Sequence, residues 1–458
     1  MANTKLIRTP SSASNRKKFT ISMWFRIGRH PFTDGAGGDS RELIGQTSSS
    51  YFRFMIQSAG TIRCYAQSGL NLITNRRFKD KAAWYHLTLR VDTTQSTASD
   101  RVRIYINGVD ERTVGGYSTN TLPSQNLDFA WNITAVHQFG GHSNNYDYFS
   151  GVMSDVVQVD GQSLAPTSFG ETDPDTGEWR IKDLTSSSFT WGTNGFMILH
   201  NGGTITDQSS NSNNWTLQSG AITNTKDCPS NLFATWNDLS TVSYKQSSGA
   251  NLTISNGNTT ILENGGQYKN VPSTIGAFTG KYYFETKIIS PVGSLQYSTY
   301  VGVITANAQA NVGNNYNHVG QTANSVGYNS YTGQVFTSDS ATSYGASLAN
   351  GDILGVALDV TNLKVYFSKN GTFQNSGNPA SGSTGTGAVS LPSTGDSWHF
   401  GGSPTNNSIQ SNFGNGFFGT TAITTNSGNG YAGAEGASKF NYAVPSGYSA
   451  LSTKGLNL

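Results

Sequence analysis

The chain has 458 residues, more than one ordinary β-sandwich needs and a suitable length for two. Charged residues make up only 12% of it and the formal net charge is +2, which excludes a general electrostatic attraction to nucleic acid or to a membrane surface. Gly, Ser, Thr and Asn replace the missing charges, while 21 Tyr and 23 Phe can build a substantial core, so a disordered polar chain is also excluded.

The first clear pair of strands lies in the first quarter of the chain. Segment 85–92 alternates apolar and polar residues from Tyr85 onward, and segment 102–106 repeats the alternation before Asn107-Gly108. The Asn-Gly dipeptide indicates a hairpin, because a type I′ turn needs positive φ at both central residues. We expect two strands here, each with one face in a core.

The same arrangement returns in the second half of the chain. Segment 353–360 alternates in the same way, and segment 363–367 leads to Asn370-Gly371. Two hairpins of similar design favour two domains of related architecture. Residues 209–224 are nearly all Ser, Asn, Thr and Gly around Trp215, a composition typical of a linker or long loop. We therefore place the domains at residues 1–225 and 226–458.

The cysteines and the amino-terminal residues indicate the cellular compartment in which the protein is made. Cys64 and Cys228 lie far apart and form neither a disulfide framework nor a CxxC pair. The first residues lack the apolar core of a secretion signal, and no window approaches about 18 uninterrupted apolar residues. We expect synthesis in a cytoplasm, no membrane insertion, and release by a route such as host lysis.

Four segments of the first domain have a family-like pattern: residues 19–25 (FTISMWF), 84–87 (WYHL), 103–108 (RIYING) and 149–156 (FSGVMSDV). On these segments the first domain resembles laminin G-like domains of the concanavalin A-like fold. The run 192–196, followed by Asp207 and residues 213–215, looks like the extension that such domains carry in proteins of marine bacteriophages.

The second domain contains four motifs in sequence: residues 280–285 (GKYYFE), 301–303 (VGV), 351–359 (GDILGVALD) and 365–371 (VYFSKNG). With these motifs in this order, the second domain resembles a SPRY domain. Both families fold as antiparallel β-sandwiches and bind glycans or protein surfaces through loops. The two resemblances together imply an all-β chain of two antiparallel β-sandwich (jelly-roll, concanavalin A-like) domains in tandem.

The pairing of these domains looks most like a tailed-bacteriophage virion protein, such as a tail fibre or tail-tip adhesin. As partners it implies other virion proteins, further copies of the same chain in a homo-oligomer, and host-surface glycan, but no nucleic acid. An alternative is a capsid decoration or architectural adaptor without receptor binding. In either case we expect the protein in the virion, assembled in the host cytoplasm.

Enzymatic activity is not expected. Because concanavalin A-like folds include glycoside hydrolases, the relevant pattern is a Glu-x-Asp-x-x-Glu alternation along one strand. The nearest stretch, residues 171–178, contains Pro174 and Gly177 and therefore indicates a turn. A glycan depolymerase is disfavoured on this ground.

No cofactor is expected, and calcium is the metal ion that we considered. Residues 173–177 place oxygen ligands on a tight Gly loop but lack the later bidentate Glu, so a solvated turn is favoured. Asp128 and Asp147 are further candidates, since some laminin G-like domains hold calcium with an Asp and nearby backbone carbonyls.

One loop in the first domain and two segments in the second combine amide and aromatic groups, and the first also contains a carboxylate. Amides and carboxylates satisfy sugar hydroxyls, while an aromatic face covers the apolar C–H patch of a sugar ring. Alternatively, these tyrosines only cap the hydrophobic edges of a sandwich. The predicted ligand residues are His142, Asn144, Asn145, Tyr146 and Asp147 in the first domain, and Asn315, Tyr316, His318, Tyr328 and Tyr331 in the second.

Overall fold

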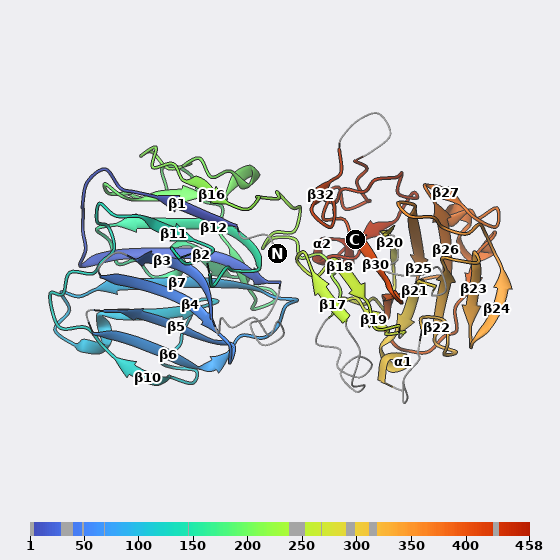
Figure 1. Cartoon of the computed structure of the whole chain (residues 1–458), viewed down its shortest axis with the longest axis horizontal. Coiled ribbons are helices and arrows are strands. Elements are labelled where there is room, and N and C mark those ends of the chain that lie inside the picture. The colour runs from blue at the N-terminus through green and yellow to red at the C-terminus, as the bar shows by residue number, and fades with distance from the viewer. Residues whose placement is uncertain are drawn as a thin grey trace. The chain divides into compact units, whose positions relative to one another are not determined.

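The computed structural model describes residues 4–28, 40–47, 50–67, 69–144, 146–237, 252–266, 268–289, 298–310, 318–424 and 430–458. The chain divides into two compact units, Met1–Asn224 and Thr225–Leu458 (Figure 1). Nearly all regular structure in the described residues is β-strand, as predicted, and the two α-helices found there are short: α1 (Ala306–Ala310) and α2 (Thr453–Leu456). None of the helices in the described part of the chain has the length and apolar character needed to span a bilayer.

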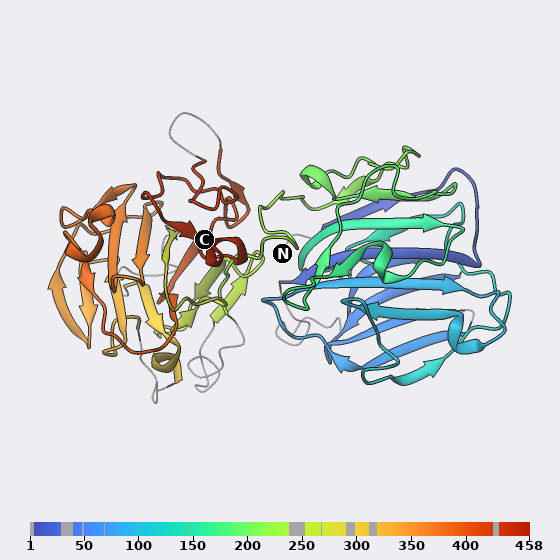
Figure 2. The ribbon, with the colours of Figure 1, turned by 180° about the vertical axis from the view of Figure 1, so that it is seen from behind.

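Two antiparallel sheets form the sandwich of the first domain, and both layers can be followed in Figures 1 and 2. Sheet 1 has the order β10 (Tyr117–Thr121), β6 (Leu70–Arg77), β5 (Thr61–Ala66), β4 (Tyr51–Gln57), β3 (Ser40–Thr47), β11 (His137–Phe139), β1 (Lys5–Arg8) and β16 (Thr216–Ser219). Sheet 2 has the order β15 (Phe196–Ile198), β12 (Gly151–Asp160), β2 (Lys18–Ile27), β7 (Trp84–Asp92), β8 (Val102–Ile106) and β9 (Val109–Asp110).

The alternation seen in the sequence decides which side chains enter the core between these sheets. On β7, Tyr85, Leu87, Leu89 and Val91 are buried in the core cluster, as predicted, because successive side chains of a strand point to opposite faces. The alternating apolar residues of β8 enter the same cluster, and Asn107-Gly108 connects β8 to β9. The period-two reading of this segment is therefore confirmed.

Residues 209–224 are not a simple loop, contrary to the sequence interpretation. Residues 216–219 form β16, which pairs with β1 at the edge of sheet 1. Trp215 is 4% exposed and packs against Phe139 and Phe196 in the core. The burial of one large aromatic ring anchors a segment whose remaining composition is that of a loop.

The outward face of sheet 2 is covered by the chain that follows β12. The segment carries a hairpin of β13 (Gly170–Thr172) and β14 (Trp179–Ile181), and its turn lies at 173–177, as predicted. Trp179 stacks on the ring of His86 and donates to its Nδ1 at 2.9 Å. Burial lowers the pKa of His86 to about 3, so this histidine is neutral. Sheet 2 therefore presents little of its own outward face to solvent.

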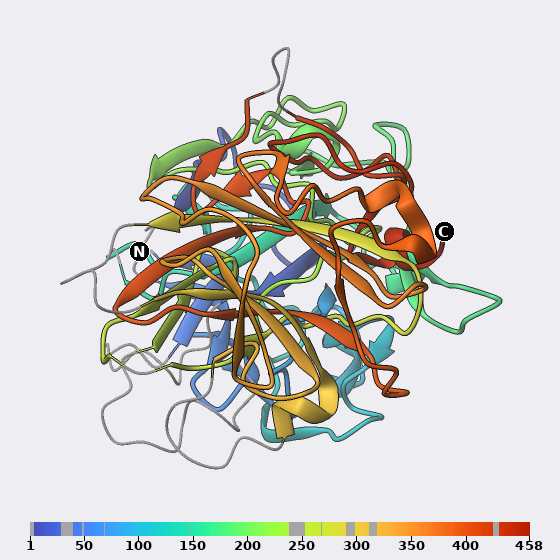
Figure 3. The same ribbon diagram turned by 90° about the vertical axis from the view of Figure 1, so that its right-hand side faces the viewer.

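The second domain also has two large sheets (Figure 3). Sheet 3 has the order β17 (Leu252–Ser255), β18 (Thr260–Glu263), β30 (Asn407–Asn412), β20 (Lys281–Ile289), β25 (Ile353–Asp359), β26 (Lys364–Lys369) and β27 (Thr372–Phe373), with β28 (Val389–Ser390) beside β26 and β33 (Ser449–Ala450) beside β20. Sheet 4 has the order β19 (Val271–Pro272), β29 (Trp398–Ser403), β21 (Tyr300–Thr305), β22 (Ser325–Asn329), β23 (Gln334–Thr337) and β24 (Ser340–Ser343). A small hairpin joins β31 (Phe417–Phe418) and β32 (Thr421–Ala422).

Packing in the second domain follows the same rules. Leu354, Val356 and Leu358 of β25 enter the core between the sheets, as the alternation predicts. The outward face of sheet 3 is covered by the end of the chain, where Phe440 and Tyr448 belong to a separate apolar cluster with side chains of β20, β25 and β26. In this domain too, a later segment covers one sheet.

The two predicted Asn-Gly hairpins are built alike. The amide of Asn107 donates to the carbonyl of His86, and its side-chain oxygen accepts from the amide of His86 at 2.7 Å. Asn370 makes the same pair of bonds with Ile353, and its side-chain oxygen accepts at 2.8 Å. Both asparagines have the positive φ that the turn requires. Two related hairpins therefore exist at the positions predicted from the sequence.

Candidate binding surface

The outward face of sheet 1 carries a row of polar and aromatic side chains. Cross-strand pairing places Asn71, Tyr65, Arg53, Gly45 and Gln138 opposite one another on β6, β5, β4, β3 and β11. Most of their neighbours along each strand, one position away, belong to the apolar core. This row is the frame of the candidate surface.

A bulge in β3 brings a buried carboxylate into the row. The register shifts between Glu42 and Ile44, and the carboxylate of Glu42 lies over the Cα of Gly45, where any larger residue would overlap it. This carboxylate accepts from Gln138 at 2.6 Å and pairs with Arg53. Burial raises the pKa of Glu42, and Arg53 and Gln138 act in the opposite direction.

Arg53 joins this carboxylate to the predicted binding loop. Its guanidinium donates to the hydroxyl of Tyr65 at 2.7 Å and to Oδ2 of Asp147 at 3.0 Å. The side chain of Asp147 is only 9% exposed. Asp147 therefore holds the loop on the sheet, and its carboxylate is not presented to solvent.

The loop 142–148 displays an aromatic ring in a fixed position. The ring of Tyr146 stacks on His142, with centroids 4.2 Å apart and planes at 20°, and Tyr146 is 46% exposed. The backbone amide of Asn144 donates to Nδ1 of His142 at 3.1 Å, and the Asn144 residue is exposed. We call Tyr146, His142 and Asn144 the Tyr146 platform. Three of the five residues predicted for this loop thus lie together, and Asn145 lies outside the described residues.

Positive charges beneath the loop keep the platform neutral and in place. Nζ of Lys5 donates to the carbonyls of His142 at 3.1 Å and Ser143 at 3.4 Å. Burial, with Arg53 and Lys5 nearby, lowers the pKa of His142 to about 4. The histidine is therefore uncharged at neutral pH.

Three of the residues predicted in the second domain lie within the described ranges, and they differ in exposure. Tyr328 is fully buried and donates to the carbonyl of Ala346, because its position on β22 points into the core, so it is not a surface ligand residue. His318 is 7% exposed and stacks on Tyr300 at 3.8 Å. Tyr331 is 61% exposed in the turn after β22. Asn315 and Tyr316 lie outside the described residues.

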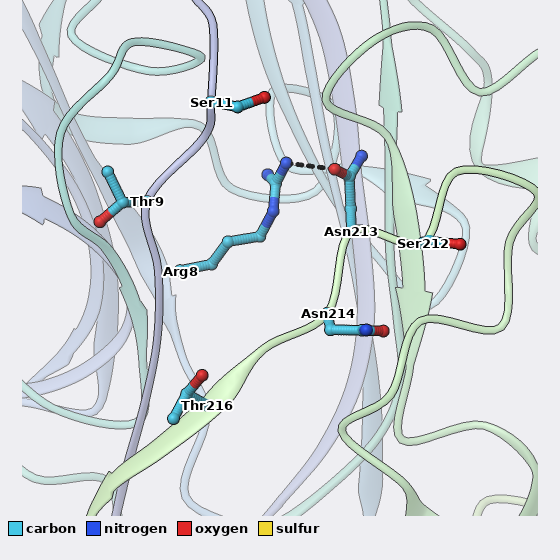
Figure 4. A pocket seen from close by; sticks show the side chains of 7 residues that line it. All are labelled: Arg8, Thr9, Ser11, Ser212, Asn213, Asn214 and Thr216. Carbon is cyan, nitrogen blue, oxygen red and sulfur yellow. Dashed lines mark hydrogen bonds between the residues drawn. The ribbon is translucent and has the colours of Figure 1, made fainter.

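A polar hollow of about 390 Å³ opens where β1 ends, beside the loop before β16 (Figure 4). Arg8 extends into it and donates to Oδ1 of Asn213 and, at 3.2 Å, to Oδ1 of Asn194. Arg8 could not be predicted from the sequence, because nothing in the chain near Arg8 indicates that residues 212–216 fold beside it. The residues that line the hollow are Arg8, Thr9, Ser11, Ser212, Asn213, Asn214 and Thr216.

Two of the acidic residues considered for calcium have other partners. Asp147 pairs with Arg53, and Oδ1 of Asp173 accepts the amides of Asp175 and Thr176 within the hairpin turn. Within the described ranges, no three His, Cys, Asp or Glu side chains form a group that could hold a metal ion.

Comparisons with known proteins agree with this architecture. Residues 2–163 match the family model of the concanavalin A-like lectin/glucanases superfamily, and residues 281–389 match that of the SPRY domain. No curated protein matches the chain.

Solved structures similar to part of the chain include the SPRY domain of human HERC1, at 17% identity and a TM-score of 0.28, covering 36% of this chain and 93% of that one. A second human SPRY domain is 16% identical with a TM-score of 0.26, and the match covers 36% of this chain and 96% of the human domain. On the evidence of the two family models, the chain joins an N-terminal laminin G-like, concanavalin A-like domain to a C-terminal SPRY domain.

Proposed function

We propose that this chain is a non-enzymatic virion adhesion protein, such as a phage tail fibre or tail-tip adhesin, whose first domain binds host-surface glycan. The observation that carries the binding role is the Tyr146 platform. A half-exposed ring with an exposed amide beside it offers a sugar both the apolar face and the hydrogen-bonding group that it needs.

The platform is organised before any ligand arrives. Lys5 holds the backbone of the loop, Arg53 holds Asp147, and His142 supports the exposed ring from below. A ligand that binds here meets side chains that are already held in place, so little conformational entropy is lost on binding. This favours recognition by a rigid surface.

The absence of catalysis is part of the proposal and is supported by the state of two carboxylates. Glu42 and Asp147 lie on the same face of sheet 1, but both are buried and both pair with Arg53. A glycosidase needs one carboxylic acid and one carboxylate that flank the scissile bond and reach the substrate. These two groups instead support the loop.

The glycan-binding role is tested with the purified full chain on a glycan array. We expect Tyr146→Ala to weaken binding about tenfold or more, roughly 1.4 kcal/mol. Tyr331→Ala, which removes an exposed tyrosine from the second domain, serves as the matched variant. Loss of binding in Tyr331→Ala alone would place the site in the SPRY domain, and shortened polysaccharide chains after incubation would contradict the non-enzymatic role.

The virion role needs a separate test, in which particles are imaged after labelling with an antibody against the chain. Label at the tail supports the adhesin. Label spread over the head, with no glycan bound on the array, supports the alternative of a decoration or adaptor protein, which would act through protein contacts burying about 1,000 Å² or more.

A further inference from the structure

We infer that the glycan bound at the Tyr146 platform is an anionic oligosaccharide that extends across the outward face of sheet 1 to Arg63. This inference rests on the proposed function, because it names the class of ligand for the same surface. It depends on the geometry and the charge of Arg63, on β5.

Two contacts fix the Arg63 side chain. Its guanidinium carbon lies 4.1 Å from the centroid of the Tyr65 ring, and its Nε donates to Oδ1 of Asn71 at 2.9 Å. Arg63 is partly exposed. A guanidinium that is already stacked and bonded at Nε has its terminal nitrogens oriented before a ligand binds.

The charge of Arg63 is not compensated by a carboxylate. In the part of the chain that the structure describes, no acidic side chain pairs with Arg63, and its two terminal nitrogens have no hydrogen-bond partner. Two other arginines of sheet 1 differ in this respect, since Arg53 pairs with Glu42 and Asp147, and Arg76 pairs with Glu111. Arg63 is therefore a positive group with donors available to a ligand.

A chain of contacts that runs through the buried Arg53 links Arg63 to the platform. Arg63 stacks on Tyr65, the hydroxyl of Tyr65 accepts from Arg53, and Arg53 holds Asp147 next to Tyr146. Strands in a sheet lie about 4.8 Å apart, so the two intervals from β5 to β3 alone span roughly 10 Å. One sugar ring cannot touch both ends, and the surface fits an oligosaccharide.

The chemistry of Arg63 defines the anionic group. A guanidinium binds a carboxylate or a sulfate through two parallel N–H donors, in a geometry that a neutral hydroxyl cannot match. The ligand class is therefore an oligosaccharide that carries a carboxylate, as in uronic and sialic acids, or a sulfate.

The test uses the full chain and a panel of oligouronates, sialylated and sulfated oligosaccharides, and the same uronates after reduction of their carboxyl groups. We expect the chain to bind acidic members more tightly than reduced ones. Arg63→Gln should weaken binding of the acidic members about tenfold or more and leave the reduced ones unchanged. Arg63→Lys, which keeps the charge without the paired donors, should give an intermediate loss.

Arg180→Gln is the matched control, because Arg180 is half exposed on the hairpin that covers sheet 2. We expect it to bind like the unaltered chain. Equal binding of acidic and reduced members, or full binding by Arg63→Gln, would overturn this inference while leaving glycan binding at Tyr146 intact. Failure of every oligosaccharide to bind would overturn the proposed function as well.

Discussion

Glu285 makes the stability of the second domain depend on pH. Its carboxylate is fully buried on the outward face of sheet 3 and accepts the backbone amides of Asn441 and Tyr442, each at 2.8 Å. Burial raises the pKa of Glu285 to about 7, although these hydrogen bonds and one from Asn412 act to lower it. Glu285→Gln should remove the resulting pH dependence.

The size of the effect follows from the difference between folded and unfolded pKa values. With an ordinary value of 4.5 and a folded value of about 7, the difference is 7 − 4.5 = 2.5. At about 1.36 kcal/mol for each pH unit this amounts to roughly 3 kcal/mol. Because the folded state takes up the proton first, this contribution is complete below pH 4.5 and is lost as the pH rises to 7.

The assay is urea unfolding of the full chain and of Glu285→Gln at intervals from pH 4 to pH 8. The glutamine side chain does not titrate in this range. The difference in unfolding free energy between the two proteins should therefore change by about 3 kcal/mol from pH 4 to pH 8. His318 and His399, whose pKa values are lowered by burial, titrate in both proteins and cancel in the difference. A difference that stays constant across the range would refute the raised pKa of Glu285.

Two further predictions concern the first domain and the cysteines. Gly45→Ala should destabilise the first domain by about 1–3 kcal/mol in urea unfolding, because the new methyl group would overlap the carboxylate of Glu42. Gly115→Ala is the control and should be close to neutral, since no atom beyond its chain neighbours lies closer than 3.9 Å to the position of its new methyl group. An equal loss of stability in both variants would contradict this reasoning. A thiol reagent should label the partly exposed Cys228 in the native protein and reach Cys64 only on unfolding. Cys64 is buried, and burial raises the pKa of its thiol. Rapid labelling of both cysteines in the native protein would show that the core around β5 opens.

Much of the fold was accessible from the sequence because it depends on local signals. The alternation from Tyr85 to Val91 and from Leu354 to Leu358 fixed the buried faces, and Asn107 and Asn370 marked two hairpins. Residues 216–219 were missed because a four-residue edge strand with a single apolar residue, Leu217, has no periodic signature. Its place is set by pairing with β1, more than two hundred residues earlier.

The binding surface was accessible only in part, for the same reason. Loop 142–148 was predicted because its ligand-type residues are adjacent in the sequence, and the structure stacks Tyr146 on His142. Tyr328 was chosen by the same criterion but points into the core from β22. Arg63 was not noticed, because its significance depends on Tyr65 and Asn71 across two strands and on the lack of a paired carboxylate.

An outward-facing aromatic residue on a strand does not by itself indicate a binding surface in this protein. Trp24 on sheet 2 and Tyr283 on sheet 3 both face away from the cores between the sheets, and both are nearly or fully buried. Trp24 stacks on His86, which Trp179 of the later hairpin covers. Tyr283 packs against Phe440 near the end of the chain. Tyr65 on sheet 1 has the same alternation but stays partly exposed. These residues differ in exposure because, in each domain, the segment that follows the sandwich packs its own aromatic residues against the outward face of one sheet. In the first domain it covers sheet 2, so side chains that can meet a ligand are found on sheet 1, around Tyr146 and Tyr65.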